Sequence, residues 1–296
     1  MIWRMGLLIA VSCGSFLIVG QKDVPSPFHR QRLTASDLEV SGMVTAIPHG
    51  ESRFVSRDFL LSLPQVTVKI ERHEDLPLVT RDGVTVTGIY LDVLAKQLGA
   101  LPESSAIEAI CTDGYAAAFP AGYTRTHRPI FVLTVDGLSA HDWAVKNHTY
   151  DAGPYFVAYE HFVPAFQVLS HDERALEPDQ LEKLLFSTKE ELYGGIEPKV
   201  AAPIAFDSPV NSGYRIARQN CFRCHNAGEY GGTQAGKSWA TLGKIAKERP
   251  EFFADWVRDP LAIDPQAKMP PNPAYDKATL TALTKYFETF AVEGKQ

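Results

Sequence analysis

Cys221-Phe222-Arg223-Cys224-His225 has the form C-x-x-C-H, the attachment signature of haem c. Its two thiols can form thioether bonds to the porphyrin, and the two intervening residues let one helical turn place both sulfur atoms along one edge of the ring. His225 then follows as the proximal axial ligand of the iron. A zinc site is the alternative, but no second C-x-x-C is present to complete one. The motif therefore predicts one covalent haem.

Met269 is the candidate for the second axial ligand. It lies in Ala267-Lys268-Met269-Pro270-Pro271, where the prolines stiffen the loop that would hold a thioether against the iron. Ligation by His and Met raises the haem potential. The alternative is a Met that fills the core beneath a proline-rich turn. The other methionines lie at the N-terminus or far upstream, at Met1, Met5 and Met43.

Three helices are predicted around the motif. They cover residues 210–220 with Asn211 or Ser212 as N-cap, 251–257 with Phe252, Phe253 and Trp256 on the buried side, and 277–290 with Leu280, Leu283, Tyr286, Phe287 and Phe290 at helical spacing. Phe252, Trp256 and Tyr275 are expected to shield the haem ring from water.

Residues 208–290 resemble the class I cytochrome c family. In that family a small residue on the first helix packs against an aromatic residue on the last, which Gly213 with Tyr286 or Phe287 would reproduce. The family often carries a proline whose carbonyl receives the proximal His ring N–H, but residues 231–239 contain none. The resemblance therefore implies that another carbonyl, of Gly236 or Lys237, orients His225.

Trp239 has two open interpretations. Its indole N–H can donate to a haem propionate, which would make Trp239 a cofactor-binding residue, or its ring can simply pack in the core.

The upstream part of the chain predicts a mixed α+β domain with a mostly β core. The strands expected are residues 66–70, 84–88, 107–111 and 129–135, and a helix is expected over 90–98. Gly99 ends that helix, and Asp113-Gly114 and Asp136-Gly137 form turns. The fold class is therefore α+β: an N-terminal mostly-β mixed domain followed by an all-α cytochrome c domain.

These landmarks resemble the sulfite-oxidase-type molybdopterin-binding fold. The resemblance rests on residues 88–94 with Gly99, on Cys111-Thr112-Asp113-Gly114-Tyr115, and on residues 135–137. It implies that Cys111 matches the thiolate ligand of molybdenum, with a small buried residue as the alternative. Residues 151–157 lack the Arg of the family's Gly-Gly-Pro-[apolar]-Arg segment, and Asp142, Asp151 and Glu160 flank this region. We therefore expect a degenerate relative that has lost molybdopterin.

The histidines of this stretch are dense but show no helical i, i+4 pair. Surface or hydrogen-bonded roles are expected for them, with a metal or substrate site as the alternative. They are His127, His141, His148, His161 and His171.

The N-terminus predicts export. Arg4 precedes an uncharged, mostly apolar run over residues 5–20, typical of a signal peptide or an uncleaved anchor. Haem c is attached after export, so this run and the motif agree. We expect the protein on the periplasmic side of the cytoplasmic membrane, anchored by this segment. By sequence the chain divides into a signal or anchor (1–20), a linker (21–32), the α+β domain (33–170), a linker (171–207, with a charged helix over 179–191) and the haem domain (208–296).

Composition limits the partners. The formal net charge is −6, with acidic residues in excess before Ala205 and a mildly basic balance after it, which suits docking to an acidic redox partner. Basic residues are scattered and not interleaved with aromatic ones, so nucleic acid is not expected. Of the four cysteines, Cys13 lies in the signal and only Cys111 remains outside the motif, so no intrachain structural disulfide is expected.

The predicted function is electron transfer by a c-type cytochrome with one covalent haem. Such a protein would serve as a membrane-tethered carrier or as a subunit of a respiratory or photosynthetic complex. The alternative is a molybdenum-dependent oxidoreductase fused to its own cytochrome acceptor.

Overall fold

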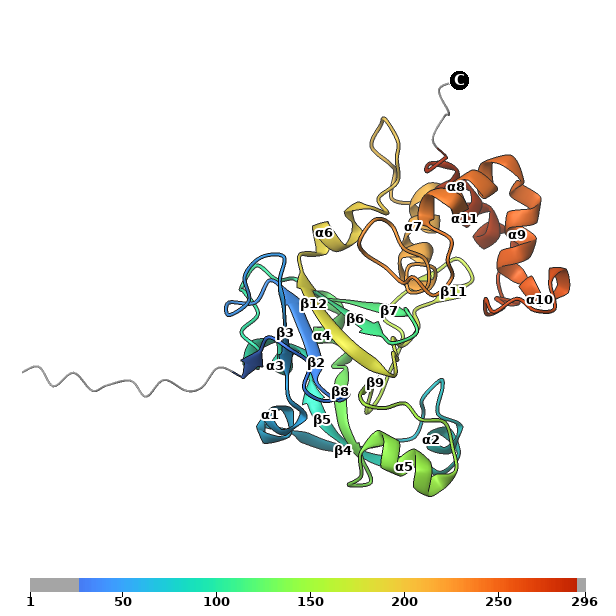
Figure 1. The fold of residues 1–296 in the computed structure, drawn as a ribbon. Helices are drawn as coiled ribbons and strands as arrows, with labels where there is room; N and C mark the ends of the chain where they lie inside the picture. Colours follow the sequence, from blue (N-terminus) through green and yellow to red (C-terminus); the bar gives the residue numbers. More distant parts are fainter. Residues whose placement is uncertain (1–26, 292–296) are drawn as a thin grey trace, which may run out of the picture.

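The computed structural model describes residues 27–291, so the predicted signal or anchor and Cys13 lie outside the described residues. A region of two main β-sheets with short helices is followed by a mostly helical C-terminal region (Figure 1). The predicted α+β class and its order along the chain are confirmed. Between residues 27 and 291, no helix is both long and apolar enough to cross a membrane.

The first sheet has six strands. Their order is β1 (Phe28–His29), β3 (Ser52–Val55), β2 (Leu38–Gly42), β12 (Leu181–Ser187), β6 (Ala106–Cys111) and β7 (Ala116–Pro120). β12 runs parallel to β2, and every other neighbouring pair in this sheet is antiparallel. Strand β6 matches the strand predicted over residues 107–111.

The second sheet has four antiparallel strands, and two short strands form a separate ladder. The order is β4 (Val66–Ile70), β5 (Val84–Tyr90), β8 (Ile130–Val135) and β9 (Phe156–Ala158); the ladder pairs β10 (Gln167–Val168) with β11 (His171–Asp172). The helices of this part are α1 (Arg57–Ser62), α2 (Pro77–Asp82), α3 (Leu91–Gln97), α4 (Ala121–His127) and α5 (Ala140–Asn147). Strands β4, β5 and β8 and helix α3 confirm the sequence predictions.

The prediction of a charged helix over residues 179–191 is wrong. This stretch forms β12 and then α6 (Lys189–Gly194), and β12 lies inside the sheet between β2 and β6 although the sequence placed it in a linker. Glu182 and Lys183 suggested a solvated helix, but Lys183 pairs with Glu39 on β2 at 3.1 Å while Leu184 is fully buried. Cross-strand pairing therefore overrode the local pattern, as tertiary context often does in sheets.

The C-terminal region consists of helices that surround an aromatic core. They are α7 (Pro209–Asn220), α8 (Trp239–Glu248), α9 (Pro250–Arg258), α10 (Pro260–Ile263) and α11 (Lys277–Glu288). The N-cap of α7 is Ser208, which accepts a hydrogen bond from the Asn211 backbone N–H, so the expected caps Asn211 and Ser212 are wrong. Helix α8 was not predicted, because Gly243 and two lysines blur its apolar stripe.

The buried face of α9 also differs from the prediction. Phe253 and Val257 are buried, whereas Phe252 and Trp256 are half-buried and lie against each other with ring centroids 5.7 Å apart. Phe253 instead meets Phe287 of α11 at 5.3 Å.

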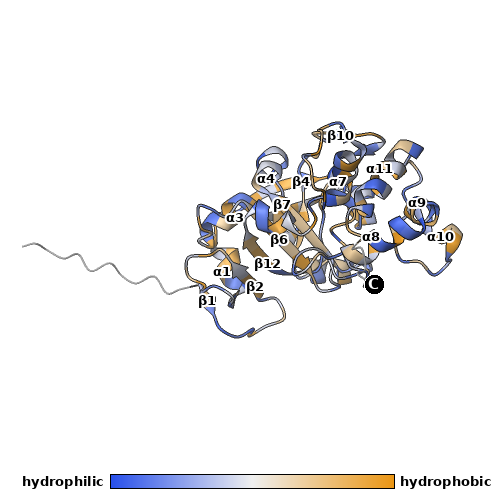
Figure 2. Ribbon diagram, turned by 90° about the horizontal axis from the view of Figure 1, so that it is seen from above, coloured by the Kyte–Doolittle hydropathy of each residue, from blue (hydrophilic) through white to orange (hydrophobic). Residues whose placement is uncertain are grey.

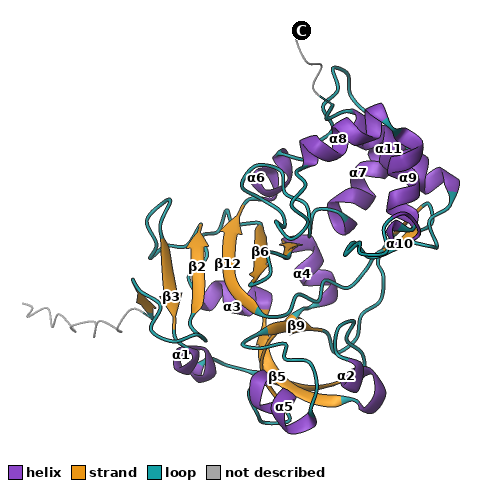
Figure 3. Cartoon of the chain, turned by 45° about the vertical axis from the view of Figure 1, so that its right-hand side comes forward, coloured by secondary structure: helices purple, strands orange, loops and turns teal. Residues whose placement is uncertain are grey.

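The helical region shares its apolar core with the sheets. Ala106 of β6 and Val168 of β10 belong to the same buried cluster as Ile216, Phe222 and the aromatic residues of α11. Figure 2 shows hydrophobic colours concentrated on the central strands, and Figure 3 shows the helices gathered beside one end of the sheets. The haem motif therefore lies against the sheet region.

Candidate haem-binding site

The C-x-x-C-H motif forms one tight turn at the end of α7. The backbone N–H of Cys221 still bonds to the Ala217 carbonyl, and those of Cys224 and His225 return to the Cys221 carbonyl at 3.2 and 3.0 Å. Both cysteines are free thiols and half-buried. Burial raises the pKa of Cys221 to about 12 and also raises that of Cys224. Two neutral thiols are thus presented on one turn, as attachment of a porphyrin edge requires.

His225 is held in one orientation by a backbone carbonyl. Its Nδ1 lies 2.8 Å from the Lys237 carbonyl oxygen, which confirms the predicted role for that carbonyl. A carbonyl only accepts, so Nδ1 carries the proton and Nε2 keeps its lone pair. Burial lowers the pKa of His225, which is 9% exposed, so the imidazole is neutral at neutral pH. Neutral imidazole with a fixed tautomer is the state that binds a metal.

Met269 lies in a loop that is anchored at Asn272. Its side chain is half-buried and packs against the same apolar cluster as Cys221. Asn272 fixes the loop: its backbone N–H donates to the Arg258 carbonyl at 2.9 Å and its Oδ1 accepts from Asn220 at 3.1 Å. Asn220 directly precedes the motif, so the Met269 loop is tied to the turn that carries the cysteines. Ligation by Met269 stays a prediction.

The indole N–H of Trp239 already has a hydrogen-bond partner within the protein. Its indole N–H donates to the Tyr286 hydroxyl at 2.9 Å, and the ring is 2% exposed among Phe222, Phe287 and Phe290. The propionate-donor role is therefore replaced by the packing role that was its alternative. Burial without a partner would be costly for the indole N–H, which explains the bond to Tyr286.

The predicted crossing of the first and last helices is confirmed at Gly213. A Cβ at this position would lie 2.1 Å from the Ala282 carbonyl oxygen and 2.6 Å from the Cβ of Tyr286. Only glycine lets α7 and α11 approach this closely. The aromatic partner is Tyr286, while Phe287 packs against Trp239 at 4.9 Å.

Tyr275 is buried beside the motif, and its shielding of a haem ring stays a prediction. Its hydroxyl lies 3.1 Å from Asn220 Nδ2 and 2.7 Å from His171 Nδ1. The other ring nitrogen of His171 lies 2.7 Å from the Gln219 side-chain oxygen. Both nitrogens of His171 therefore have partners, and this histidine joins the upstream region to the helical C-terminal region.

The remaining upstream histidines take surface or hydrogen-bonded roles, as expected. Buried His127 lies 3.1 Å from Glu173, and exposed His141 lies 2.7 Å from Asp151. His148 and His161 are exposed. Across residues 27–291, no group of three or more His, Cys, Asp or Glu side chains is arranged to hold a metal ion.

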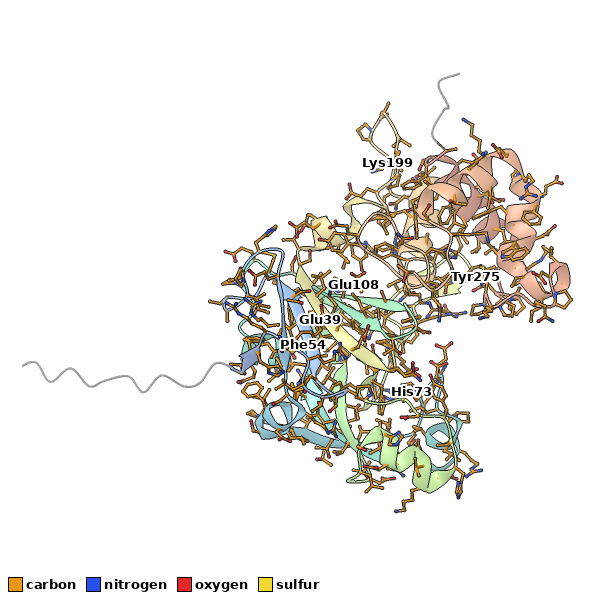
Figure 4. The ribbon with its side chains drawn as sticks, in the orientation of Figure 1. Glu39, Phe54, His73, Glu108, Lys199 and Tyr275 are labelled. Atoms are coloured by element: carbon orange, nitrogen blue, oxygen red, sulfur yellow. The ribbon has the colours of Figure 1, made fainter. Side chains whose placement is uncertain are left out.

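Glu108 belongs to the site but was missed by sequence reasoning. It lies on β6 at 2% exposure and accepts a hydrogen bond from the Gly231 backbone N–H at 2.7 Å (Figure 4 labels it between the sheet and the helices). Burial raises its pKa to about 7, an effect that the Gly231 bond and Lys183 oppose. A lone carboxylate inside an apolar strand was the available signal, since such groups are rarely buried without a partner.

The turn after β6 contacts the haem motif directly. The Ala116 backbone N–H donates to the Arg223 carbonyl at 2.9 Å, and the Thr233 N–H donates to the Gly114 carbonyl at 2.7 Å. The Gln234 amide bonds both to Asp113 and to the Cys224 thiol. The Cys111–Tyr115 segment and the haem motif therefore form one contact surface.

Cys111 is a buried thiol with carboxylates nearby. It is 3% exposed, and burial followed by the carboxylates of Asp179 and Asp113 strongly raises the pKa of its thiol. The buried Oδ2 of Asp179 has no hydrogen-bond partner among the described residues, and burial raises the pKa of Asp179 to about 6. The negative charge of these carboxylates disfavours an anionic ligand beside Cys111.

Comparisons with known proteins add little to this geometry. No protein-family profile matches the chain, and no curated protein matches its sequence. The chain is similar to a solved structure described as the sulfane dehydrogenase SoxCD from Paracoccus pantotrophus, with 13% sequence identity and a TM-score of 0.34. The match covers 55% of this chain and 42% of that chain, so this chain spans less than half of that one. At this similarity, only the chain's own residues bear on its function.

Proposed function

We propose that this protein is an electron-transfer c-type cytochrome with one covalent haem. Cys221 and Cys224 would attach the porphyrin, and His225 and Met269 would ligate the iron. The observation that carries the proposal is the 2.8 Å bond from His225 Nδ1 to the Lys237 carbonyl, which leaves Nε2 available beside two free thiols. Haem supplies reversible one-electron chemistry once it is attached.

The chain's own residues would orient the group and exclude water. Gly213 brings α7 against α11, so the turn that bears the motif starts from a rigid helix pair. Asn272 and Asn220 tie the Met269 loop to that turn. Buried Tyr275 covers the motif from the side of the upstream region. A low-polarity setting of this kind favours the less charged form of the redox centre.

The partner and the location follow from the same proposal. Electrons would pass to a redox protein or to a membrane respiratory or photosynthetic complex, and the N-terminal segment would hold the protein at the periplasmic side of the cytoplasmic membrane. The haem-side excess of basic residues suits an acidic partner surface. The upstream region, as a cofactor-free relative of the molybdopterin-binding fold, would present the haem region to that partner.

A molybdenum oxidoreductase fused to its acceptor is the second candidate. The direct contact between the Cys111–Tyr115 segment and the haem motif favours it, because two redox centres there would be adjacent. The acidic, buried setting of Cys111 opposes it. Elemental analysis of the purified full-length protein separates the two: stoichiometric molybdenum that is lost in Cys111→Ser would establish the enzyme.

Substitution of Met269 tests the proposed ligand set. The full-length protein, produced in cells with a haem-attachment system, should titrate as a single one-electron couple. Met269→Leu should lower the midpoint potential and abolish the weak near-infrared sulfur-to-iron absorption band of the oxidised form. Met43→Leu changes a half-buried methionine of the upstream region and serves as the matched control.

The control should leave both the potential and the band unchanged. If Met269→Leu leaves them unchanged as well, the thioether is not the ligand.

A further inference from the structure

A cavity of about 230 Å³ lies behind the haem motif. Its walls come from β7 and α4 on one side and from α7 on the other, and Figure 3 shows α4 on the side of the sheets that faces the helices. Phe222 and Arg223, the two residues between the cysteines, line it, while Cys221 and Cys224 do not. The cavity is therefore distinct from the haem side of the turn.

Two arginines of α7, Arg215 and Arg218, line the cavity and pack against aromatic rings. The Arg215 guanidinium lies over the rings of Phe166 and Phe206, at 5.6 and 5.3 Å from their centroids. The Arg218 guanidinium lies 5.1 Å from the ring centroid of Tyr193. Within residues 27–291, neither arginine forms an ion pair with a carboxylate. Arg218 also lies over the ring of Tyr214 and hydrogen-bonds to its hydroxyl, so aromatic packing fixes both guanidinium groups while neither is neutralised by a carboxylate.

Among the described residues that line the cavity, Glu173 is the only one with a carboxylate, and that carboxylate is already paired. Glu173 lies 3.1 Å from His127 Nε2 and accepts the Ala165 backbone N–H at 2.6 Å, and its side chain is 5% exposed. Arg223 adds a third guanidinium. The wall therefore carries an excess of positive charge in a partly desolvated setting, where an arginine binds an oxyanion more strongly than in water.

Apart from Thr126, His127 and Gln219, the rest of the wall is mostly apolar and aromatic. Ala116 and Ala118 of β7 and Tyr123 of α4 lie on one side, and Phe222 lies on the side of α7. A bare inorganic anion would leave this surface facing water, whereas an apolar body would cover it.

We propose that this cavity binds a small organic acid, with its carboxylate on Arg215 and Arg218 and its apolar body against Phe222 and the alanines of β7. The carboxylate would take the bidentate arrangement that a guanidinium fork favours. Nothing in this site depends on how the haem iron is ligated, so binding and electron transfer can be tested separately.

Calorimetric titration of the full-length protein with benzoate tests the proposal. Benzoate should bind at low ionic strength, while benzamide, its neutral isostere, and acetate, which lacks the apolar body, should bind at least about tenfold more weakly. Parallel titrations with phosphate and sulfate test whether an inorganic anion binds instead. No binding of benzoate at millimolar concentration, or equal binding of benzamide, overturns the proposal, and preferred binding of phosphate or sulfate overturns the organic-acid class.

Substitutions assign the binding to the two arginines. Arg215→Gln and Arg218→Gln should each weaken benzoate binding by about tenfold. Arg249→Gln is the matched control, because Arg249 also lies over an aromatic ring, that of Phe252, but outside the cavity wall. Arg218→Lys keeps the positive charge but loses the planar guanidinium. This variant should fold normally and still bind benzoate more weakly than the natural protein does. Equal weakening by Arg249→Gln, or no weakening by either cavity variant, excludes the site.

Discussion

His225 in the helical region and Cys111 in the sheet region are affected by burial in the same way, with opposite consequences. Burial drives each toward its neutral form, lowering the pKa of His225 and raising that of Cys111. A neutral imidazole is ready to bind a metal, whereas a thiol binds only as the thiolate. Burial therefore leaves His225 ready for a metal, whereas a metal at Cys111 would have to displace the thiol proton.

The two residues also differ in their partners. His225 has a carbonyl that fixes its proton on Nδ1, while Cys111 is surrounded by Asp179, Asp113 and Glu182. The protonation of each side chain thus depends on the groups that the fold places next to it. The sheet region supports the haem region through contacts, and the following substitutions probe how far each depends on the other.

Leu184→Ala should have the largest effect on stability. Leu184 is fully buried at the middle of β12, and its truncation should reduce the free energy of unfolding by about 2–5 kcal/mol. Leu61→Ala, at a residue that is 37% exposed, is the control and should cost far less. Denaturant unfolding followed by circular dichroism measures both. A loss below about 1 kcal/mol would mean that β12 is not an integral strand of the sheet.

Glu108→Gln should remove a pH dependence of up to about 3 kcal/mol. The pKa of Glu108 is 4.5 ordinarily and about 7 in the folded chain. Below pH 4.5 both states are protonated. As the pH rises toward 7 the unfolded chain loses a proton that the folded chain keeps, so the free energy of unfolding falls. Glutamine keeps the acceptor for Gly231 without the charge.

Unfolding of Glu108→Gln and the natural protein at pH 5 and pH 8 measures this effect. The variant should gain relative stability at pH 8 and little at pH 5. Exposed Glu103→Gln is the control and should gain nothing at either pH. If the Glu108→Gln variant is less stable than the natural protein at pH 8, the charged carboxylate stabilises the fold. That result would contradict the raised pKa of Glu108.

Gly213→Ala should cost about 1–3 kcal/mol, the usual range for an overpacked core. The new methyl group would meet the Ala282 carbonyl at 2.1 Å, so α7 and α11 must move apart. Gly194→Ala adds a methyl group with nothing within 4 Å and should change stability by less than about 0.5 kcal/mol. Thermal unfolding compares the two, and equal costs would show that the helix crossing is looser than described.

Features set by a short motif or by helical spacing could be predicted from the sequence. Contacts between residues far apart in the sequence could not. The turn of Cys221–His225, the Lys237 carbonyl and the Gly213–Tyr286 crossing were predictable, because a motif or a fixed helical spacing specifies each. Strand β12 was mistaken for a helix, because its charges are matched by Glu39 on a strand far away in sequence. Glu108 and the contact between the β6 turn and the motif were missed for the same reason.

The covalent haem is the central claim, and the mass of the denatured full-length protein tests it most directly. Protein from cells with a working haem-attachment system should carry one haem per chain that survives denaturation. Cys224→Ala should weaken that attachment, while Cys111→Ser, the matched substitution outside the motif, should leave it intact. A natural protein that denatures to its bare polypeptide mass would contradict the account.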